Sequence, residues 1–172
     1  MKLIDQQKTD IEQEIKEMIE GNAFLKEKIA HVCTIKGIGL ITAAIIVAET
    51  NGFHLIKSKK QLVSYAGLDV QNKDSGTSVH LKPRISRKGN KYLRKAVYFP
   101  ALSAIRSEDK MKNLFTRLVG KHGIKMKAAV AVQRKLLELV YTLWKKNEDF
   151  DPNYERNKKV RATTGAALNE IA

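Results

Sequence analysis

The chain has 172 residues, enough for one compact domain with a helical arm but short for two full domains. Its formal net charge is +14 and its pI about 9.9, an imbalance that points to an acidic partner, most often nucleic acid. No apolar run approaches the roughly 20 residues of a spanning helix, the first residues show no signal peptide, and the single cysteine, Cys33, excludes an internal disulfide and a cysteine-based metal site. We therefore expect a cytoplasmic protein with no membrane partner.

Residues 1–33 are predicted to form a long helical arm. Its seam residues recur at alternating spacings of four and three, as in a heptad repeat: Ile4, Lys8, Ile11, Ile15, Met18, Asn22, Leu25, Ile29 and Val32. The pattern fits a helix that packs on its own domain equally well as a coiled coil that pairs with another chain. Gly21-Asn22 is the one place where the arm is expected to bend or turn back.

Residues 34–67 are predicted to form two short helices after a turn that contains Gly37 and Gly39. Two glycines around one apolar residue allow a sharp reversal and expose backbone N–H groups at the start of the helix 40–49, where phosphate can bind. The pattern resembles a helix-hairpin-helix element, although such a turn often only joins two packed helices. Asn51-Gly52 ends that helix, and Ser58 is expected to cap the next one, 59–65.

The densest charge lies between Lys82 and Lys95, where seven basic residues occur without an acidic one. A run of this kind repels itself unless an anion neutralises it, so phosphate contact is favoured over a merely solvated helix. We expect a loop that carries Ser75, a turn at Pro83, a cap at Ser86 and a helix over 91–105 bent at Pro100. Taken by itself, Ser75 has the sequence context of an ordinary turn residue.

The remaining sequence predicts helices over 110–120 and 125–146, followed by a disordered tail over 151–172. The expected fold is therefore all-α: a helical domain over 34–150 with a helix-hairpin-helix-like element, preceded by a long heptad-patterned N-terminal helix.

The motifs taken in order resemble one family. They are Ile35-Lys36-Gly37-Ile38-Gly39 with Thr42-Ala43, Gln61-Leu62, Tyr65-Ala66-Gly67-Leu68, Ser75-Gly76, residues 85–90 with Leu93-Arg94, and residues 131–137. Their order and spacing are similar to the C-terminal domain of the insertion-sequence transposases related to the Piv and MooV DNA invertases. Members of this family have a RuvC-like domain with four metal-binding acidic residues, and some are guided by a bridge RNA.

The resemblance implies a DNA transposase or recombinase in which Ser75 is the nucleophile that becomes joined to DNA. It also implies that the basic segment holds DNA or structured guide RNA, that the arm builds a homo-oligomer, and that Mg²⁺ is held by a RuvC-like domain outside this chain. By the same resemblance we expect the protein to be bacterial and nucleoid-associated. We expect the chain alone to bind nucleic acid, to need no cofactor of its own and not to recombine DNA. The candidate nucleic-acid-binding residues are Lys36, Gly37, Gly39, Lys82, Arg84, Arg87, Lys88, Gly89, Asn90, Lys91 and Arg94.

A second interpretation stays open on sequence grounds. In it the chain is a non-catalytic nucleic-acid-binding module built on the hairpin between helices, and Ser75 only forms a turn.

Overall fold

The computed structural model describes the backbone of residues 2–75 and 79–154, and their side chains except those of 72–75 and 79–83. The described residues form a mostly helical fold with one two-stranded sheet, so the all-α prediction is confirmed. In chain order the elements are α1 (Lys2–Glu20), α2 (Ala23–Cys33), α3 (Leu40–Glu49), α4 (Lys59–Tyr65), β1 (Val70–Ser75), β2 (Val79–Ile85), α5 (Lys91–Ala96), α6 (Tyr98–Ser107), α7 (Asp109–His122) and α8 (Lys125–Lys146).

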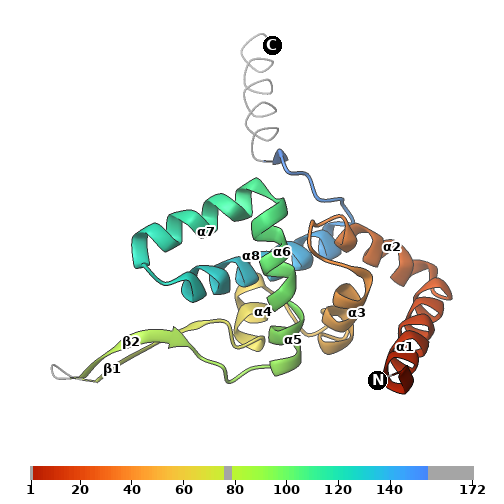
Figure 1. Ribbon diagram of the computed structural model, residues 1–172, viewed down its shortest axis with the longest axis horizontal. Coiled ribbons are helices and arrows are strands. Elements are labelled where there is room, and N and C mark those ends of the chain that lie inside the picture. The colour runs from red at the N-terminus through yellow and green to blue at the C-terminus, as the bar shows by residue number, and fades with distance from the viewer. Residues whose placement is uncertain (1, 76–78, 155–172) are drawn as a thin grey trace, which may run out of the picture.

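Helix α8 is the centre of the fold, and α2, α4, α6 and α7 all pack against it (Figure 1). It buries an apolar stripe that includes Leu136, Val140 and Trp144. Phe53, which is fully buried, meets this stripe with its ring 5.6 Å from those of Tyr141 and Trp144. Aromatic rings in such tilted and edge-on contacts add attraction beyond the burial of their area, so α8 anchors the loop between α3 and α4.

The N-terminal arm is two helices, not the one long helix that the heptad pattern predicted. The break falls at Gly21-Asn22, where a bend was expected, and the Asn22 side chain accepts a hydrogen bond from the Leu25 N–H at 3.0 Å. This cap starts α2 as a new helix. Helix α1 then packs on α2 and α3 through Ile15 and the buried Ile19.

The stretch that was expected to be a loop around Ser75 is an antiparallel hairpin. Val70 pairs with Ile85 and Ser75 with Val79, with an irregularity between Gln71 and Lys73. Pro83 lies inside β2 and not at a turn. A two-stranded ribbon consists of edge strands only, and an edge strand tolerates the missing N–H of a proline.

The predicted helix over 91–105 is divided at Val97 into α5 and α6. Pro100 therefore lies in the first turn of α6, where a backbone N–H has no partner within the helix in any case. Its ring favours the bend that was expected, but it does so by starting a second helix. In the described part of the chain, no helix combines the length and apolarity needed to cross a bilayer.

The turn between α2 and α3 packs on α6 through Gly37. Gly37 has a φ of +97°, and an added Cβ would lie 2.7 Å from the carbonyl oxygen of Pro100. Gly39 differs, because its φ is −95° and no atom lies within 4 Å of its added Cβ. Of the two glycines, therefore, Gly37 is the one that the packing of the turn requires.

We predict that Gly37→Ala lowers the free energy of unfolding by about 2 kcal/mol or more, because it adds backbone strain to an overlap with α6. Gly39→Ser is the matched control and should leave stability unchanged or raise it by a few tenths of a kcal/mol, since serine is a good helix cap. Urea unfolding followed by circular dichroism measures both. Equal stability of the two variants would show that the turn does not contact α6 in this way.

Candidate nucleic-acid interface

The loop 86–90 is fixed to the end of α4 by backbone hydrogen bonds. The Asn90 N–H donates to the Tyr65 carbonyl at 2.7 Å, and the Arg87 N–H donates to the Gly67 carbonyl at 3.1 Å. Ser86 was expected to cap the following helix, but its hydroxyl donates to Asp69 Oδ1 at 2.5 Å. Asn90 caps α5 in its place, because its side-chain oxygen accepts from the N–H groups two and three residues further on.

Gly89 allows this loop to lie directly against the backbone of α4. An added Cβ would overlap the Tyr65 carbonyl oxygen and would lie 2.5 Å from the Gly67 nitrogen. Gly67 faces it with a φ of +65° and with 2.7 Å between its own added Cβ and the Gly89 nitrogen. The close approach at Gly89 is therefore made to the protein's own backbone. Whether Gly89 also contacts nucleic acid stays a prediction.

Two polar side chains hold α5 in place behind the loop. The half-buried Arg94 donates to the Ala66 carbonyl at 2.7 Å and to the Gly89 carbonyl at 3.3 Å. Asn90 Nδ2 donates to Glu49 Oε2 at 2.6 Å and so connects the loop to α3. Arg94 thus stabilises the loop through these hydrogen bonds, while its positive charge still adds to the positive potential of the surface.

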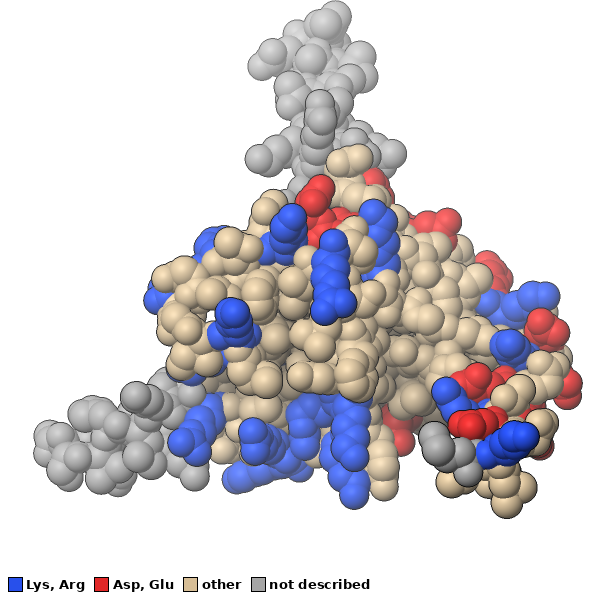
Figure 2. Space-filling model, in the orientation of Figure 1, with Lys and Arg blue, Asp and Glu red and all other residues tan. Residues whose placement is uncertain are grey.

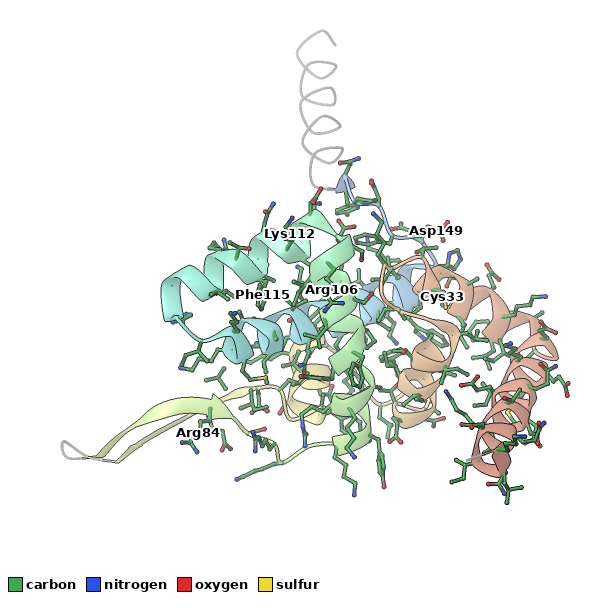
Figure 3. The ribbon with its side chains drawn as sticks, viewed as in Figure 1. Cys33, Arg84, Arg106, Lys112, Phe115 and Asp149 are labelled. Carbon is green, nitrogen blue, oxygen red and sulfur yellow. The ribbon has the colours of Figure 1, made fainter. Side chains whose placement is uncertain are left out.

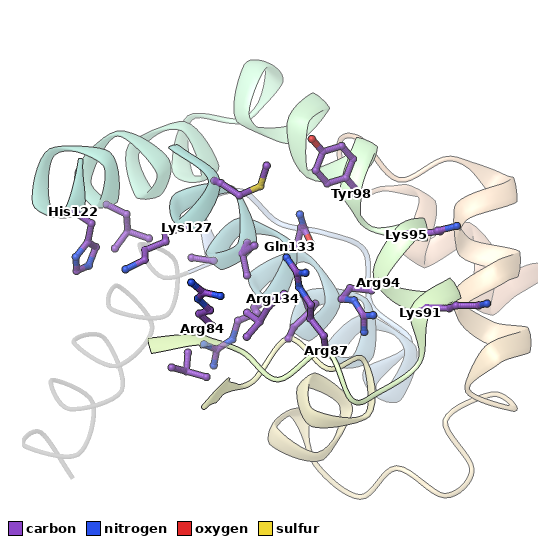
Figure 4. A pocket seen from close by; sticks show the side chains of 17 residues that line it. Arg84, Arg87, Lys91, Arg94, Lys95, Tyr98, His122, Lys127, Gln133 and Arg134 are labelled. Atoms are coloured by element: carbon purple, nitrogen blue, oxygen red, sulfur yellow. The ribbon is translucent and has the colours of Figure 1, made fainter. Parts of the chain in front are cut away.

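Between the base of the hairpin, α5 and α8 lies an open groove of about 960 Å³ (Figure 4). No Asp or Glu is among the residues that line it. The cationic residues that line it are Arg84, Arg87, Lys91, Arg94, Lys95, Lys127 and Arg134. Apolar side chains lie among them, and the remaining lining residues include Tyr98, His122 and Gln133.

The charges of this groove are largely uncompensated. Arg84, Arg87, Lys95, Lys127 and Arg134 form no ion pair with any other side chain in the described part of the chain. Figure 2 shows lysine and arginine side chains side by side along the lower edge of the molecule, next to the hairpin, whereas α1 carries both signs. A concave surface of one sign focuses its field and attracts a polyanion.

The groove brings together four of the candidate residues, Arg84, Arg87, Lys91 and Arg94. Lys88, Gly89 and Asn90 lie in the loop beside it but do not line it. The side chain of Lys82 lies outside the described residues.

Lys36, Gly37 and Gly39 lie elsewhere. Lys36 is near the junction of α6 and α7, with its Nζ 3.7 Å from Glu108 Oε2 and 3.4 Å from the Ser107 carbonyl. The Glu108 carboxylate is only 8% exposed, so Lys36 serves as the counter-charge of a buried acid. Nucleic-acid contact at this turn stays a prediction, separate from the groove.

Ser75 is the last residue of β1, and its side chain and Gly76 lie outside the described residues. Val70, at the other end of β1, lines the groove, so the strand runs from the groove toward Ser75. The five residue steps from Val70 to Ser75 correspond to about 17 Å at 3.3 Å per residue.

The predicted site residues did not include Tyr98, His122, Lys127, Gln133 and Arg134. They also did not include Lys95, although Lys95 ends the basic run that begins at Lys82. Lys127, Val130, Ala131 and Arg134 have the spacing of one helix face, which is the only signal of this wall in the sequence. That spacing shows a basic-apolar face of α8, but it does not show that the face turns toward the hairpin.

No group of three or more His, Cys, Asp or Glu side chains that could hold a metal ion occurs in the described part of the chain. These residues therefore offer no donor set for Mg²⁺. Burial raises the pKa of the half-buried Cys33 thiol, which disfavours the nucleophilic thiolate. Figure 3 places Cys33 at the end of α2, away from Arg84 in the hairpin.

Comparison with known proteins identifies a family match over residues 29–116, to the "Transposase IS116/IS110/IS902 family". The pilin gene-inverting protein of Moraxella bovis is 29% identical over 144 residues, which are 83% of this chain and 45% of that protein. The transposase for insertion sequence element IS1111A of Coxiella burnetii is 27% identical over 145 residues, 82% of this chain and 38% of the relative. An insertion element IS110 protein of Streptomyces coelicolor is 23% identical over 81% of this chain and 33% of its own length.

The chain spans less than half the length of these curated relatives. The family match extends from the end of α2 through the turn, the hairpin and α5 into α7, and so includes the cationic loop and one wall of the groove. Because this match covers slightly more than half of the residues, the chain belongs to the IS116/IS110/IS902 transposase family.

Proposed function

We propose that this chain is the nucleic-acid-binding, serine-bearing part of a DNA transposase or recombinase. The observation that carries the proposal is the groove, in which the cations of the predicted basic segment meet those of α8 without an acidic residue. The names of the relatives, a pilin gene-inverting protein and insertion-sequence transposases, favour DNA as the partner. The same charges suit the phosphates of a structured guide RNA equally well.

Binding by such a groove is driven largely by the release of counterions from phosphates. Each cation that neutralises a phosphate contributes about one unit to the slope of log K against log salt. Cations that already serve the fold, such as Arg94 at the Ala66 carbonyl, contribute less than those without a protein partner, such as Arg134.

In this proposal Ser75 is the nucleophile of strand exchange. Its hydroxyl oxygen forms a bond to phosphorus, the bond from phosphorus to one sugar oxygen breaks, and that oxygen leaves with the proton that the serine gives up. Attack by the hydroxyl of another strand reverses the step and restores a phosphodiester. Such a reaction requires neutralised charge at the phosphate and a stabilised leaving oxygen. We assign these tasks to a Mg²⁺-binding, RuvC-like domain outside this chain.

We further propose that the protein self-associates through α1. Ile4, Ile11 and Met18, seven residues apart on this helix, are 69%, 56% and 72% exposed. Three large apolar side chains in one exposed row favour pairing with another helix of the same kind. Ile15 and Ile19 of the same helix already pack against the core of the domain.

The binding proposal is tested with Arg134→Glu against Lys135→Glu, which change the net charge equally at neighbouring positions. Arg134 lines the groove, whereas the exposed Lys135 does not. We predict that Arg134→Glu weakens binding to labelled DNA or RNA about tenfold at moderate salt and lowers the salt slope by about one, and that Lys135→Glu has a clearly smaller effect. Fluorescence anisotropy over a series of KCl concentrations measures both. Equal effects of the two variants would contradict binding in the groove.

The catalytic proposal is tested with Ser75→Ala in a full-length relative whose matching region is replaced by this chain. We predict that strand exchange and the covalent protein–DNA product are lost while DNA binding stays nearly unchanged, because only the attacking oxygen has been removed. Ser78→Ala, a serine three residues on, is the control and should retain both. Strand exchange that survives Ser75→Ala favours the non-catalytic binding module with Ser75 as a turn residue.

Self-association is tested with Ile11→Asp, which places a charge in the exposed row of α1. We predict that sedimentation velocity shows an assembly for the unaltered chain and a smaller species for this variant, because a carboxylate cannot be buried unpaired between helices. Gln13→Asp, on the same helix outside the seam, should leave the assembly intact. A single species of the same mass for all three proteins would refute the interface.

A further inference from the structure

The groove contains more than the cations that phosphate binding requires. Apolar side chains line it as well. We call the buried Leu68 and the half-buried Ile85, Val130 and Ala131 its apolar floor. A site that only attracts phosphates has no need of an apolar floor, since phosphates stay hydrated and bind cations and N–H groups. An apolar surface bordered by cations matches the two parts of a nucleotide, a flat base and a charged backbone.

Gln133 adds a polar group to this floor. Its residue is only 4% exposed, it lines the groove, and its side chain makes no hydrogen bond with any other described residue. A carboxamide offers two hydrogen-bond donors on its nitrogen and an acceptor oxygen. Thr50 and Glu108, the other buried polar residues of the described part, use their side chains within the fold: Thr50 donates to the Ile46 carbonyl, and Glu108 pairs with Lys36. No buried side-chain nitrogen or oxygen in that part lacks a hydrogen bond, so the amide atoms of Gln133 are not enclosed but open to the groove. The Gln133 amide is therefore available to a ligand bound there.

The shape of the groove decides which form of nucleic acid can reach this amide. Pockets of about 300–1,000 Å³ enclose molecules the size of a drug or a nucleotide, and this groove lies near the upper end of that range. In a duplex the base edges lie at the bottom of the helical grooves, where a recessed side chain in a concave surface cannot reach them. A base must leave its stack before it can contact Gln133.

We propose that the groove binds one unpaired nucleotide, with its base on the apolar floor and its edge hydrogen-bonded to the Gln133 amide, while the flanking phosphates lie on the Arg84, Lys127 and Arg134 side chains. This inference rests on the proposed nucleic-acid binding and specifies its substrate as a bulged, flipped or single-stranded site. Because the amide pairs with base edges selectively, the groove also distinguishes one base from another.

The test uses the full 172-residue chain and labelled duplexes that differ only at one position, which carries no bulge, a single bulged A, C, G or T/U, or an abasic bulge. We expect the preferred bulged base to bind about tenfold more tightly than the fully paired duplex, and the abasic bulge to lose most of that gain. The same set made in DNA and in RNA shows which of the two backbones supplies the nucleotide.

Gln133→Met removes the amide at similar volume. We expect it to abolish the preference among bases, with an unchanged salt slope and no fall in melting temperature, because no protein hydrogen bond is lost. Ala131→Phe, which fills the floor without changing a charge, should also remove the advantage of the bulge. Gln13→Met on α1 makes the same chemical change on an exposed surface and should have no effect.

Equal affinity for paired and bulged duplexes would overturn this inference and leave the proposed binding function standing. A marked loss of melting temperature with Gln133→Met would also overturn it, because the amide would then hold the fold together. Absence of binding to every one of these nucleic acids would instead refute the proposed function itself.

Discussion

The contact between Gly89 and the end of α4 is the constraint on which the cationic surface depends. Without a Cβ at Gly89, the loop that follows β2 lies against the backbone of Tyr65 and Gly67. That position brings Arg87 and the start of α5 to face α8, whose Arg134 comes from the opposite side of the groove. The positive charges gathered around the groove repel one another in the absence of a ligand. Backbone hydrogen bonds, which salt screens little, are what keep these charges together.

In the proposed function, this arrangement couples the stability of the groove to the binding of nucleic acid. A ligand that neutralises the cations removes a repulsion that the fold otherwise bears, so binding and folding stabilise each other. Two cations of α5 are held differently. Arg94 donates a hydrogen bond to the Ala66 carbonyl, whereas the exposed Lys91 only lies over the ring of Tyr92, 5.0 Å from its centroid. The groove therefore combines a cation that is bonded to the fold with one that makes no such bond.

The parts of the fold that depend on local chemistry could be predicted from the sequence. The limits of α3, α4 and α8 agree with the prediction, and Ser58 caps α4 as expected, because caps and helical periods act over a few residues. The hairpin was missed because Val70–Ser75 is polar without alternation and β2 contains a proline. Its two strands hold each other only through a pairing that a local pattern does not contain.

The candidate site divides in the same way. The basic run over 82–95 was evident as composition, and four of its predicted residues do meet in one groove. The wall from α8 was not evident, since Lys127 and Gln133 lie more than thirty residues further along the chain. Lys36 shows how packing adds a second role to such a residue, because the lysine before Gly37 lies beside the buried carboxylate of Glu108. Its contact with nucleic acid stays a prediction. Sequence patterns thus indicate which chemistry is present, while tertiary packing decides which of it is free to act.

In the proposed function, the hairpin sets the distance between the groove that binds nucleic acid and the serine that reacts with it. Val70 lies at the groove and Ser75 at the other end of the same strand, about 17 Å away. Successive base pairs of a B-form duplex rise by about 3.4 Å, so this distance spans about five of them. A nucleotide held in the groove would then position a phosphate about five base pairs away beside Ser75, and the hairpin would fix the separation between the groove and the serine. Because a two-stranded ribbon without a third strand is easily bent, the hairpin becomes rigid only when the nucleic acid or another domain packs along its length.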